Sequence, residues 1–405
     1  MVRSASIFEN RTFRLFYGGQ AFSYLGDGLR LIAIPLLVYR LTGSALSLGA
    51  TYALELGPFA FFGLLGGSLA DRIDRRSLMI GCDVVRFAVM AAIAIGYARG
   101  TLSLGFVYVG VATLAIAAAV FVGAQSSSIP YLLGKERAVA AMSALLAAEQ
   151  VSQTVIPPLG GALFALIGPL PALAINAGTY LVSQGSLALA GGFGPDAPGR
   201  WPSLRAIGGD IAAGFDFLAH DPALRAFAAI SLAFNFFGFV NIATFIPFLK
   251  VDFGASDATV GIVLGLGALG SVLGSWLSAR VPARWHFGRI IQIAYALDAL
   301  LFLPVVLTHD LRVVIPFLAL SNACVLFEIA HIVGWRIRIT PEPLVGRVSA
   351  AARLVALLGT VPGALIGGAF ADHAGPRAAM MLGEFGYLAL AVAIWLVPSI
   401  RRERR

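Results

Sequence analysis

Charged residues are scarce in this chain of 405 residues. Only 12% of the residues are Asp, Glu, Lys or Arg, whereas 59% are hydrophobic and the mean hydropathy is +0.86. A water-soluble core could not hide so much apolar surface. The shortage of charge therefore excludes an ordinary soluble protein and predicts one that spans a membrane.

Cysteine is nearly absent, and the usual signatures of enzymes are missing. Cys82 and Cys324 lie within or beside apolar stretches, without a CxxC or Cys/His spacing, so we interpret them as small buried hydrophobes and expect no metal site or cofactor. A Walker loop is lacking, which excludes an ATP-driven pump, and neither G-x-S-x-G nor H-E-x-x-H occurs. We therefore expect a protein that is not an enzyme.

Long apolar stretches are what the chain has instead. A helix needs about 20 apolar residues to cross a bilayer. Stretches of this length occur at 13–39, 45–70, 78–97, 102–127, 138–166, 170–191, 223–249, 258–279, 287–307, 312–333, 348–371 and 376–397. The sequence thus predicts an all-α membrane protein with twelve transmembrane helices, the first of which is too long for a cleaved signal peptide.

Basic residues gather on one side of these predicted spans. The net charge of +8 could suggest a nucleic-acid partner, and the positions of the 29 basic residues along the chain test this possibility. Arg30 lies inside a span, and the outer side holds Arg40, Arg99, Lys250, Arg312 and Arg377. All the others lie on the inner side, which by the positive-inside rule places both termini in the cytoplasm and argues against nucleic acid.

A polar stretch divides the chain into two similar halves. We predict bundles of six helices at 1–190 and 223–405, joined by a cytoplasmic linker at 191–222 that is rich in Gly, Pro and Asp. Gly168-Pro169 recurs as Gly375-Pro376, and other pairs recur at nearly the same offset. Parallel repeats of this kind are typical of transporters whose substrate site lies between two rocking halves.

The loop after the second predicted span carries the most specific motif. It fits the pattern G-x-x-x-D-R-x-G-R-[RK] at Gly67, Asp71, Arg72, Arg75 and Arg76. Asp74 replaces the usual glycine, and we expect it to occupy the left-handed turn position that glycine favours. The chain resembles the major facilitator superfamily over its whole length, which implies the major facilitator fold of two pseudo-symmetric six-helix bundles.

The resemblance also implies a cytoplasmic gate. In this family the signature loop belongs to an inner charge network, for which Asp83 and Arg86 are candidates, and Asp71 is expected to meet the start of the eleventh span. That start offers free N–H groups and the positive charges of Arg347 and Arg353. The alternative is a loop that only fixes the orientation of the protein in the membrane.

Further phrases resemble a subgroup of bacterial exporters that includes the enterobactin exporter and macrolide efflux pumps. They are Asn10-Arg11-x-Phe13-Arg14, Gly26-Asp27, Ile34 to Tyr39 and Thr42-Gly43-Ser44. The stretch Pro157-Pro158-Leu159-Gly160-Gly161 is similar to the G-P-x-x-G-G element of proton antiporters, with Pro157 in place of glycine. The resemblance therefore implies export by proton antiport.

Ionisable residues inside predicted spans are candidates for coupling, because burying charge in a membrane is costly. Asp27 and Arg30 lie three residues apart on one helix face, either as a local ion pair or as a proton carrier and the cation that controls it. Glu55 precedes Pro58 by three residues, and its role could equally be to support a kink or to bind a proton or cation.

Polar residues on other spans are candidates for the substrate cavity. They are Glu149 and Gln153, Asn235 and Asn241, and Glu328 and His331. The first pair could instead be a polar seam between helices, and the last either a proton relay or a histidine that reaches the water. Asp298 and Glu384 fall on helices that the resembled fold places at the periphery, so we expect packing or lipid-interface roles for them.

These features predict a monomeric secondary transporter in the bacterial inner membrane, with protons, a small amphipathic molecule and the lipid bilayer as its partners. It would export a drug, siderophore or other secondary metabolite by proton antiport and alternating access. The alternatives are an uptake symporter or uniporter, and a transporter-like sensor that moves nothing.

Overall fold

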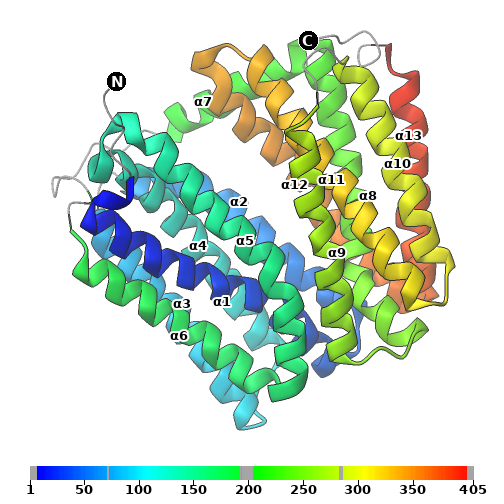
Figure 1. Ribbon diagram of the computed structural model, residues 1–405, viewed down its shortest axis with the longest axis horizontal. Coiled ribbons are helices and arrows are strands. Elements are labelled where there is room, and N and C mark those ends of the chain that lie inside the picture. Colours follow the sequence, from blue (N-terminus) through cyan, green and yellow to red (C-terminus); the bar gives the residue numbers. More distant parts are fainter. Residues whose placement is uncertain (1–6, 71–72, 192, 194–203, 282–285, 399–405) are drawn as a thin grey trace. The chain divides into compact units, whose positions relative to one another are not determined.

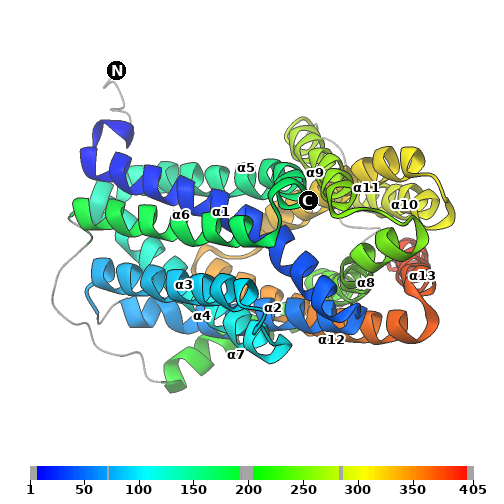
Figure 2. The same cartoon turned by 90° about the horizontal axis from the view of Figure 1, so that it is seen from below.

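The computed structural model describes residues 7–70, 73–191, 193, 204–281 and 286–398, and the regular structure in this part of the chain is helical throughout. The chain forms two compact units. The first consists of Met1–Leu41 and Leu54–Pro202, and the second of Thr42–Ala53 and Ser203–Arg405. The end of α1 and the start of α2 thus belong to the second unit. Figures 1 and 2 show the helices along the chain in two views.

The first unit contains most of the helices up to α6, and Figure 1 shows α1, α3 and α6 running alongside one another. The elements are η1 (Ile7–Glu9), α1 (Arg11–Thr42), α2 (Ala45–Ala70), α3 (Arg75–Ala98), α4 (Leu104–Leu133), α5 (Lys135–Ile167) and α6 (Pro169–Leu189). Helix α3 packs against both α4 and α6. Part of the core is a cluster that includes the fully buried Phe13, Phe16 and Met79.

The second unit contains the remaining helices. They are α7 (Leu204–His220), α8 (Pro222–Asp252), α9 (Asp257–Ser278), α10 (Phe287–Leu307), α11 (Leu311–Ile339), η2 (Glu342–Leu344), α12 (Val345–Ala374) and α13 (Pro376–Leu396). Helix α8 packs against α12 and α13, while α10 packs against α11 and α13. At one end of this core the rings of Phe287 and Trp335 stack with centroids 4.9 Å apart.

Local sequence explains where these helices begin. Ser103, Asp221, Ser256 and Asp310 each accept a backbone N–H in the first turn of the following helix, as N-cap residues do. The repeated Gly-Pro pairs have one structural role in both units. Gly168 and Gly375 adopt φ of 79° and 93°, and the proline after each opens the next helix.

Each of the twelve predicted spans coincides with a helix. Among the described residues, nine helices are long and apolar enough to cross a membrane: α1, α3, α4 and α8 to α13. The predicted linker 191–222 contains a helix that the sequence did not reveal, α7. Its Phe215, Phe217 and Leu218 pack on the core of the second unit, so a segment that reads as polar carries one apolar face.

Glycines allow the closest helix crossings of the second unit. A Cβ at Gly270 would lie 1.7 Å from the carbonyl oxygen of Ala319, and one at Gly274 would lie 2.0 Å from that of Ala323. Helices α9 and α11 therefore touch backbone to backbone, as small residues permit in membrane helices.

Candidate functional site

Arg30 lies between two carboxylates in the first unit. Its Nη1 donates to Glu55 Oε1 at 2.6 Å, and its Nε lies 3.7 Å from Asp27 Oδ1. The Arg30 and Glu55 side chains are 13% and 17% exposed, and Asp27 is 28% exposed. The structure thus joins all three residues predicted for proton coupling around one cation, with two acids competing for it.

Tyr180 connects this trio to a deeper polar network. Its hydroxyl donates to Asp27 Oδ1 at 2.6 Å, and the guanidinium of Arg86 lies 5.5 Å from the centre of its ring. Arg86 also lies 3.5 Å from Asp83, which accepts from Ser183 at 2.6 Å. Asp83 and Arg86 are 1% and 5% exposed. The bonds described for Asp83 and Arg86 therefore lead to α6 and toward Asp27, and not to the signature loop.

Helix α1, which carries Asp27 and Arg30, packs closely against α5. A Cβ at Gly28 would lie 2.8 Å from the Ser152 backbone, and one at Gly160 would lie 2.9 Å from Leu29. Gly160 of the antiporter-like element thus faces α1, two residues from Asp27. Pro157, Pro158 and Gly161 also lie in α5, but their side chains and surroundings are outside the described part of the structure.

The signature loop is described in part. Gly67 lies in α2, whereas Asp71 and Arg72 fall outside the described residues. Arg76 donates to the carbonyl oxygens of Leu187 and Ala188 at the end of α6, and Arg75 lies over the ring of Tyr131 at 4.5 Å. Both described arginines therefore bind within the first unit, where they fix the start of α3.

Asp74 differs from its expected conformation. Its φ is −50°, which is not the left-handed region, and its carboxylate accepts the N–H of Ser77 at 2.8 Å as the N-cap of α3. Burial raises the pKa of this carboxyl, but the hydrogen bonds from Ser77 and the charge of Arg76 outweigh burial and the pKa is lowered. The aspartate thus replaces the turn glycine with a helix cap.

The remaining gate candidates lie at the start of α12 in the second unit. Arg347 and Arg353 are both exposed, in the first three turns of that helix. A Cβ at Gly214 would lie 2.3 Å from the carbonyl oxygen of Arg347, so the unpredicted helix α7 packs directly on this segment. Their expected contact with Asp71 stays a prediction.

Three of the predicted cavity residues form short-range bonds. Gln153 donates to Glu149 at 3.2 Å along the exposed face of α5. Asn235 donates to the carbonyl oxygen of Ser231 at 2.7 Å and lies 3.5 Å from Thr360 of α12. Glu149, Gln153 and Asn235 therefore have partners nearby in the structure, and their contact with a substrate stays a prediction.

Glu328 and His331 share α11 but do not bind each other. His331 Nδ1 lies 2.8 Å from the carbonyl oxygen of Phe327 and 3.5 Å from Ser278 of α9. Glu328 is 1% exposed, and neither of its carboxyl oxygens has a hydrogen-bond partner among the described residues. The structure thus does not support a direct relay between the two.

Asp298 and Glu384 are buried, which agrees with the packing alternative and not with a lipid-interface role. They are 2% and 1% exposed and point into the bundle from α10 and α13. Asp298 accepts from Ser321 of α11 at 2.5 Å, whereas both oxygens of Glu384 lack a described partner. Asn241 lies beside them against Gly383, with its amide also unpartnered. Sequence position could suggest a peripheral helix but not the face that each residue occupies.

Asp372 is a functional candidate that the sequence did not reveal. Its carboxylate accepts from Ser44 Oγ at 2.5 Å and from the N–H groups of Ala45 and Leu46 at 2.6 and 3.2 Å. These groups open α2, whose first turn has no intrahelical acceptors. A residue 327 positions away thus caps α2 and attaches its start to α12.

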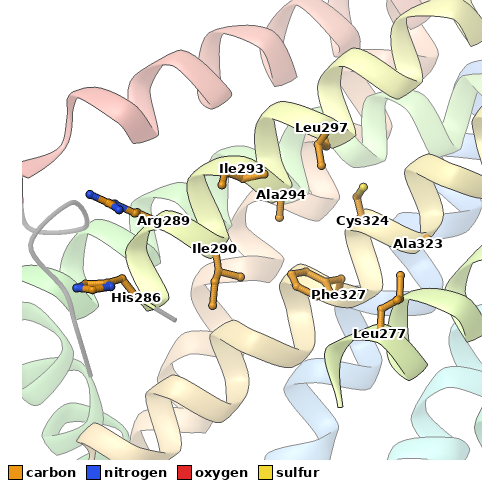
Figure 3. A pocket seen from close by; sticks show the side chains of 10 residues that line it. All are labelled: Leu277, His286, Arg289, Ile290, Ile293, Ala294, Leu297, Ala323, Cys324 and Phe327. Carbon is orange, nitrogen blue, oxygen red and sulfur yellow. The ribbon is translucent and has the colours of Figure 1, made fainter. Parts of the chain in front are cut away.

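A groove of about 480 Å³ lies between α9, α10 and α11 of the second unit (Figure 3). Its lining is mostly apolar and includes Leu277, Ile290, Ala294, Cys324 and Phe327. Figure 3 shows His286 and Arg289 at the end of the groove where α10 begins. The groove lies inside one unit and is separate from the Arg30 site.

Comparison with known proteins identifies the family. The profile of the family described as transmembrane secretion effector matches residues 3–403. The chain belongs to this family of major facilitator transporters. It is 26% identical over 396 residues to the multidrug efflux pump Tap of Mycolicibacterium fortuitum, with 93% of each chain covered.

Two further relatives agree with this assignment. The enterobactin exporter EntS of Escherichia coli O1:K1 is 23% identical, over 97% of this chain and 93% of its own. A bacterial homologue of the human lysosomal transporter Spinster has the same fold, with a TM-score of 0.74, 16% identity and 99% of both chains covered. The protein is thus a multi-pass bacterial membrane transporter whose relatives include efflux pumps.

Proposed function

We propose that this protein exports a small amphipathic organic molecule across the bacterial cytoplasmic membrane in exchange for protons. The family supports transport, and two relatives named as exporters support its direction. The observation that carries the coupling mechanism is the position of Arg30 between Glu55 and Asp27.

One arginine cannot neutralise two carboxylates. When both acids are ionised the trio carries one negative charge, and in a poorly hydrated site this charge favours uptake of a proton. Because Asp27 lies farther from Arg30 and is more exposed, we assign the proton to Asp27 and the stable ion pair to Glu55. Tyr180 would hold the Asp27 carboxylate in place through its hydroxyl.

Substrate and proton would then compete at this site. A bound cationic or hydrogen-bonding substrate would stabilise the ionised form of Asp27, and its release would allow a proton to return. Such exclusive occupancy is what antiport requires. Glu149, Gln153, Asn235 and Asn241 are the remaining neutral and acidic candidates for substrate contact.

For the gate, we propose that Asp71 binds the start of α12 beside Arg347 when the cavity opens outward. Arg75 and Arg76 would act indirectly, because their described contacts hold the start of α3. Both termini would be cytoplasmic, as the distribution of arginines indicates, and the monomer would be the working unit.

A flux assay in proteoliposomes tests the proposal. Drugs and siderophores would be screened under an imposed pH gradient, with Asp27→Asn in parallel and Glu136→Gln, an exposed acid of the same unit, as the control. We expect gradient-driven extrusion that Asp27→Asn abolishes and the control retains. Accumulation in place of extrusion would indicate an uptake symporter, binding without flux would indicate a sensor, and full transport by Asp27→Asn would refute the proton assignment.

A further inference from the structure

Three carboxyl groups are buried together inside the second unit, far along the chain from the Arg30 site. Asp298, Glu328 and Glu384 come from α10, α11 and α13 and are each no more than 2% exposed. Helix α10 packs against both of the other helices. Asp298 thus lies on the helix that contacts the helices of both other carboxyls.

This cluster differs from the Arg30 site because it has no cation. No described Lys, Arg or His forms an ion pair or hydrogen bond with any of the three carboxyls. The other polar groups near them are Ser321, Asn241, Tyr295 and Tyr387, together with the thiol of Cys324. Moving ionised carboxylates into such surroundings costs several kcal/mol each, so three charges cannot persist there together.

Hydrogen bonding leads to the same conclusion. All four oxygens of Glu328 and Glu384 lack a partner in the described structure, although buried polar groups nearly always have one. Two such residues in one cluster indicate a site that binds something. Among the described residues no three acidic, His or Cys side chains are close enough to hold a metal ion. Separate carboxyls that cannot share a metal ion can each still take up a proton.

We propose that Asp298, Glu328 and Glu384 form a second proton-binding site, located in the C-terminal unit. The inference rests on the proposed function, since a proton site contributes to transport only where protons drive it. At neutral pH the cluster holds at least one proton and therefore at most two negative charges. A charge on Asp298 would make ionisation of Glu328 and of Glu384 more costly, so the protonation of these two depends on Asp298.

The groove of Figure 3 shares helices α10 and α11 with this site. Ala294 and Asp298 are four residues apart on α10, and Cys324 and Glu328 are four apart on α11, so each pair shares a helix face. Both Ala294 and Cys324 line the groove. Asp298 and Glu328 therefore each lie one helical turn along the chain from a residue that lines the groove.

Infrared spectroscopy of the full-length protein in lipid nanodiscs tests this site directly. Protonated carboxyl groups absorb separately from carboxylates, so we expect a protonated-carboxyl band at neutral pH that disappears in alkali. Asp298→Asn, Glu328→Gln and Glu384→Gln should each weaken the band and shift the titration of what remains. Glu342→Gln, an exposed acid of the same unit, should change neither. Absence of the band in the unmodified protein, or a band that none of the three substitutions alters, would overturn the proposal.

Two further measurements test whether a metal cation occupies the site and whether the site contributes to transport. Replacing choline chloride by sodium chloride should leave the band unchanged, whereas its loss in sodium would mean that a metal cation occupies the site and would refute the proton assignment. In proteoliposomes, the three variants should export with a weaker dependence on the pH gradient. If all three variants export with the same dependence on the pH gradient as the unmodified protein, the proposal of a second proton site is wrong, but the proposed export function is unaffected. If the unmodified protein exports nothing, the proposed function is contradicted. The infrared band then still tests the proton site by itself.

Discussion

Replacing Glu55 by Gln should destabilise the first unit strongly. The substitution preserves shape but removes the negative charge that accepts the 2.6 Å hydrogen bond from Arg30. Arg30 would retain Asp27 as its charged neighbour, at 3.7 Å from Nε. Because both side chains of the broken pair are less than one-fifth exposed, water can replace the lost partner only in part.

The magnitude follows from this burial. Breaking a fully buried ion pair costs about 3–5 kcal/mol, and because Asp27 remains near Arg30 we expect the low end of that range. A loss of about 3 kcal/mol corresponds to a roughly hundredfold rise in the ratio of unfolded to folded protein, at about 1.4 kcal/mol per factor of ten. Equilibrium unfolding in sodium dodecyl sulfate, followed by circular dichroism, measures it.

The matched control is Glu136→Gln, which removes an exposed acid from the first turn of α5 in the same unit. It should cost no more than about 1 kcal/mol, the usual size of a helix-dipole effect. If Glu55→Gln costs as little as this control, the Arg30–Glu55 pair is not a structural ion pair. The structural reason for assigning the stable ion pair to Glu55 and the proton to Asp27 would then be lost.

Three other predictions concern single contacts. Gly270→Ala should lower the free energy of unfolding by about 1–3 kcal/mol, because the added methyl group forces α9 away from α11. Gly334→Ala is the control, because nothing lies within 4 Å of a Cβ at that position. Equal unfolding midpoints for the two variants would contradict the close crossing of α9 and α11. Asp372→Ala should speed hydrogen exchange at the amides of Ala45 and Leu46, which Asp372 caps. Asp310→Ala, which removes the cap of α11, is the control and should leave those two amides protected. Unchanged exchange in Asp372→Ala would show that the cap on α2 is not formed. Because the pKa of Asp74 is lowered on folding, its cap on α3 is fully present above the unfolded pKa and is lost as pH falls through the folded value. The protection of the Ser77 amide, measured against its intrinsic exchange rate at each pH, should therefore fall in acid, and in Asp74→Ala it should be weak at every pH.

Some features of the site follow from sequence because they depend on neighbours along one helix. Asp27 and Arg30 share a face through their spacing, and the structure joins them as expected. Glu55 was a candidate only because a charged residue inside a membrane span is costly. Its partner, Arg30, became evident only from the structure, in which α2 lies beside α1. Glu328 and His331 also share a helix, yet His331 turns toward α9, because helical spacing does not decide which neighbouring helix a side chain meets.

What the sequence by itself determined is what a bilayer demands, apolar stretches of sufficient length, together with the Gly-Pro pairs repeated in both halves. These depend on local composition and on the solvent around the chain. Tertiary structure alone decided the rest: the amphipathic α7 inside the linker, the cap that Asp372 places on α2, and the burial of Asp298 and Glu384 beside Glu328. The physical reason is that a membrane helix is apolar on all sides, so hydrophobic pattern does not distinguish its lipid face from its protein face. Only packing shows which face each carboxyl occupies.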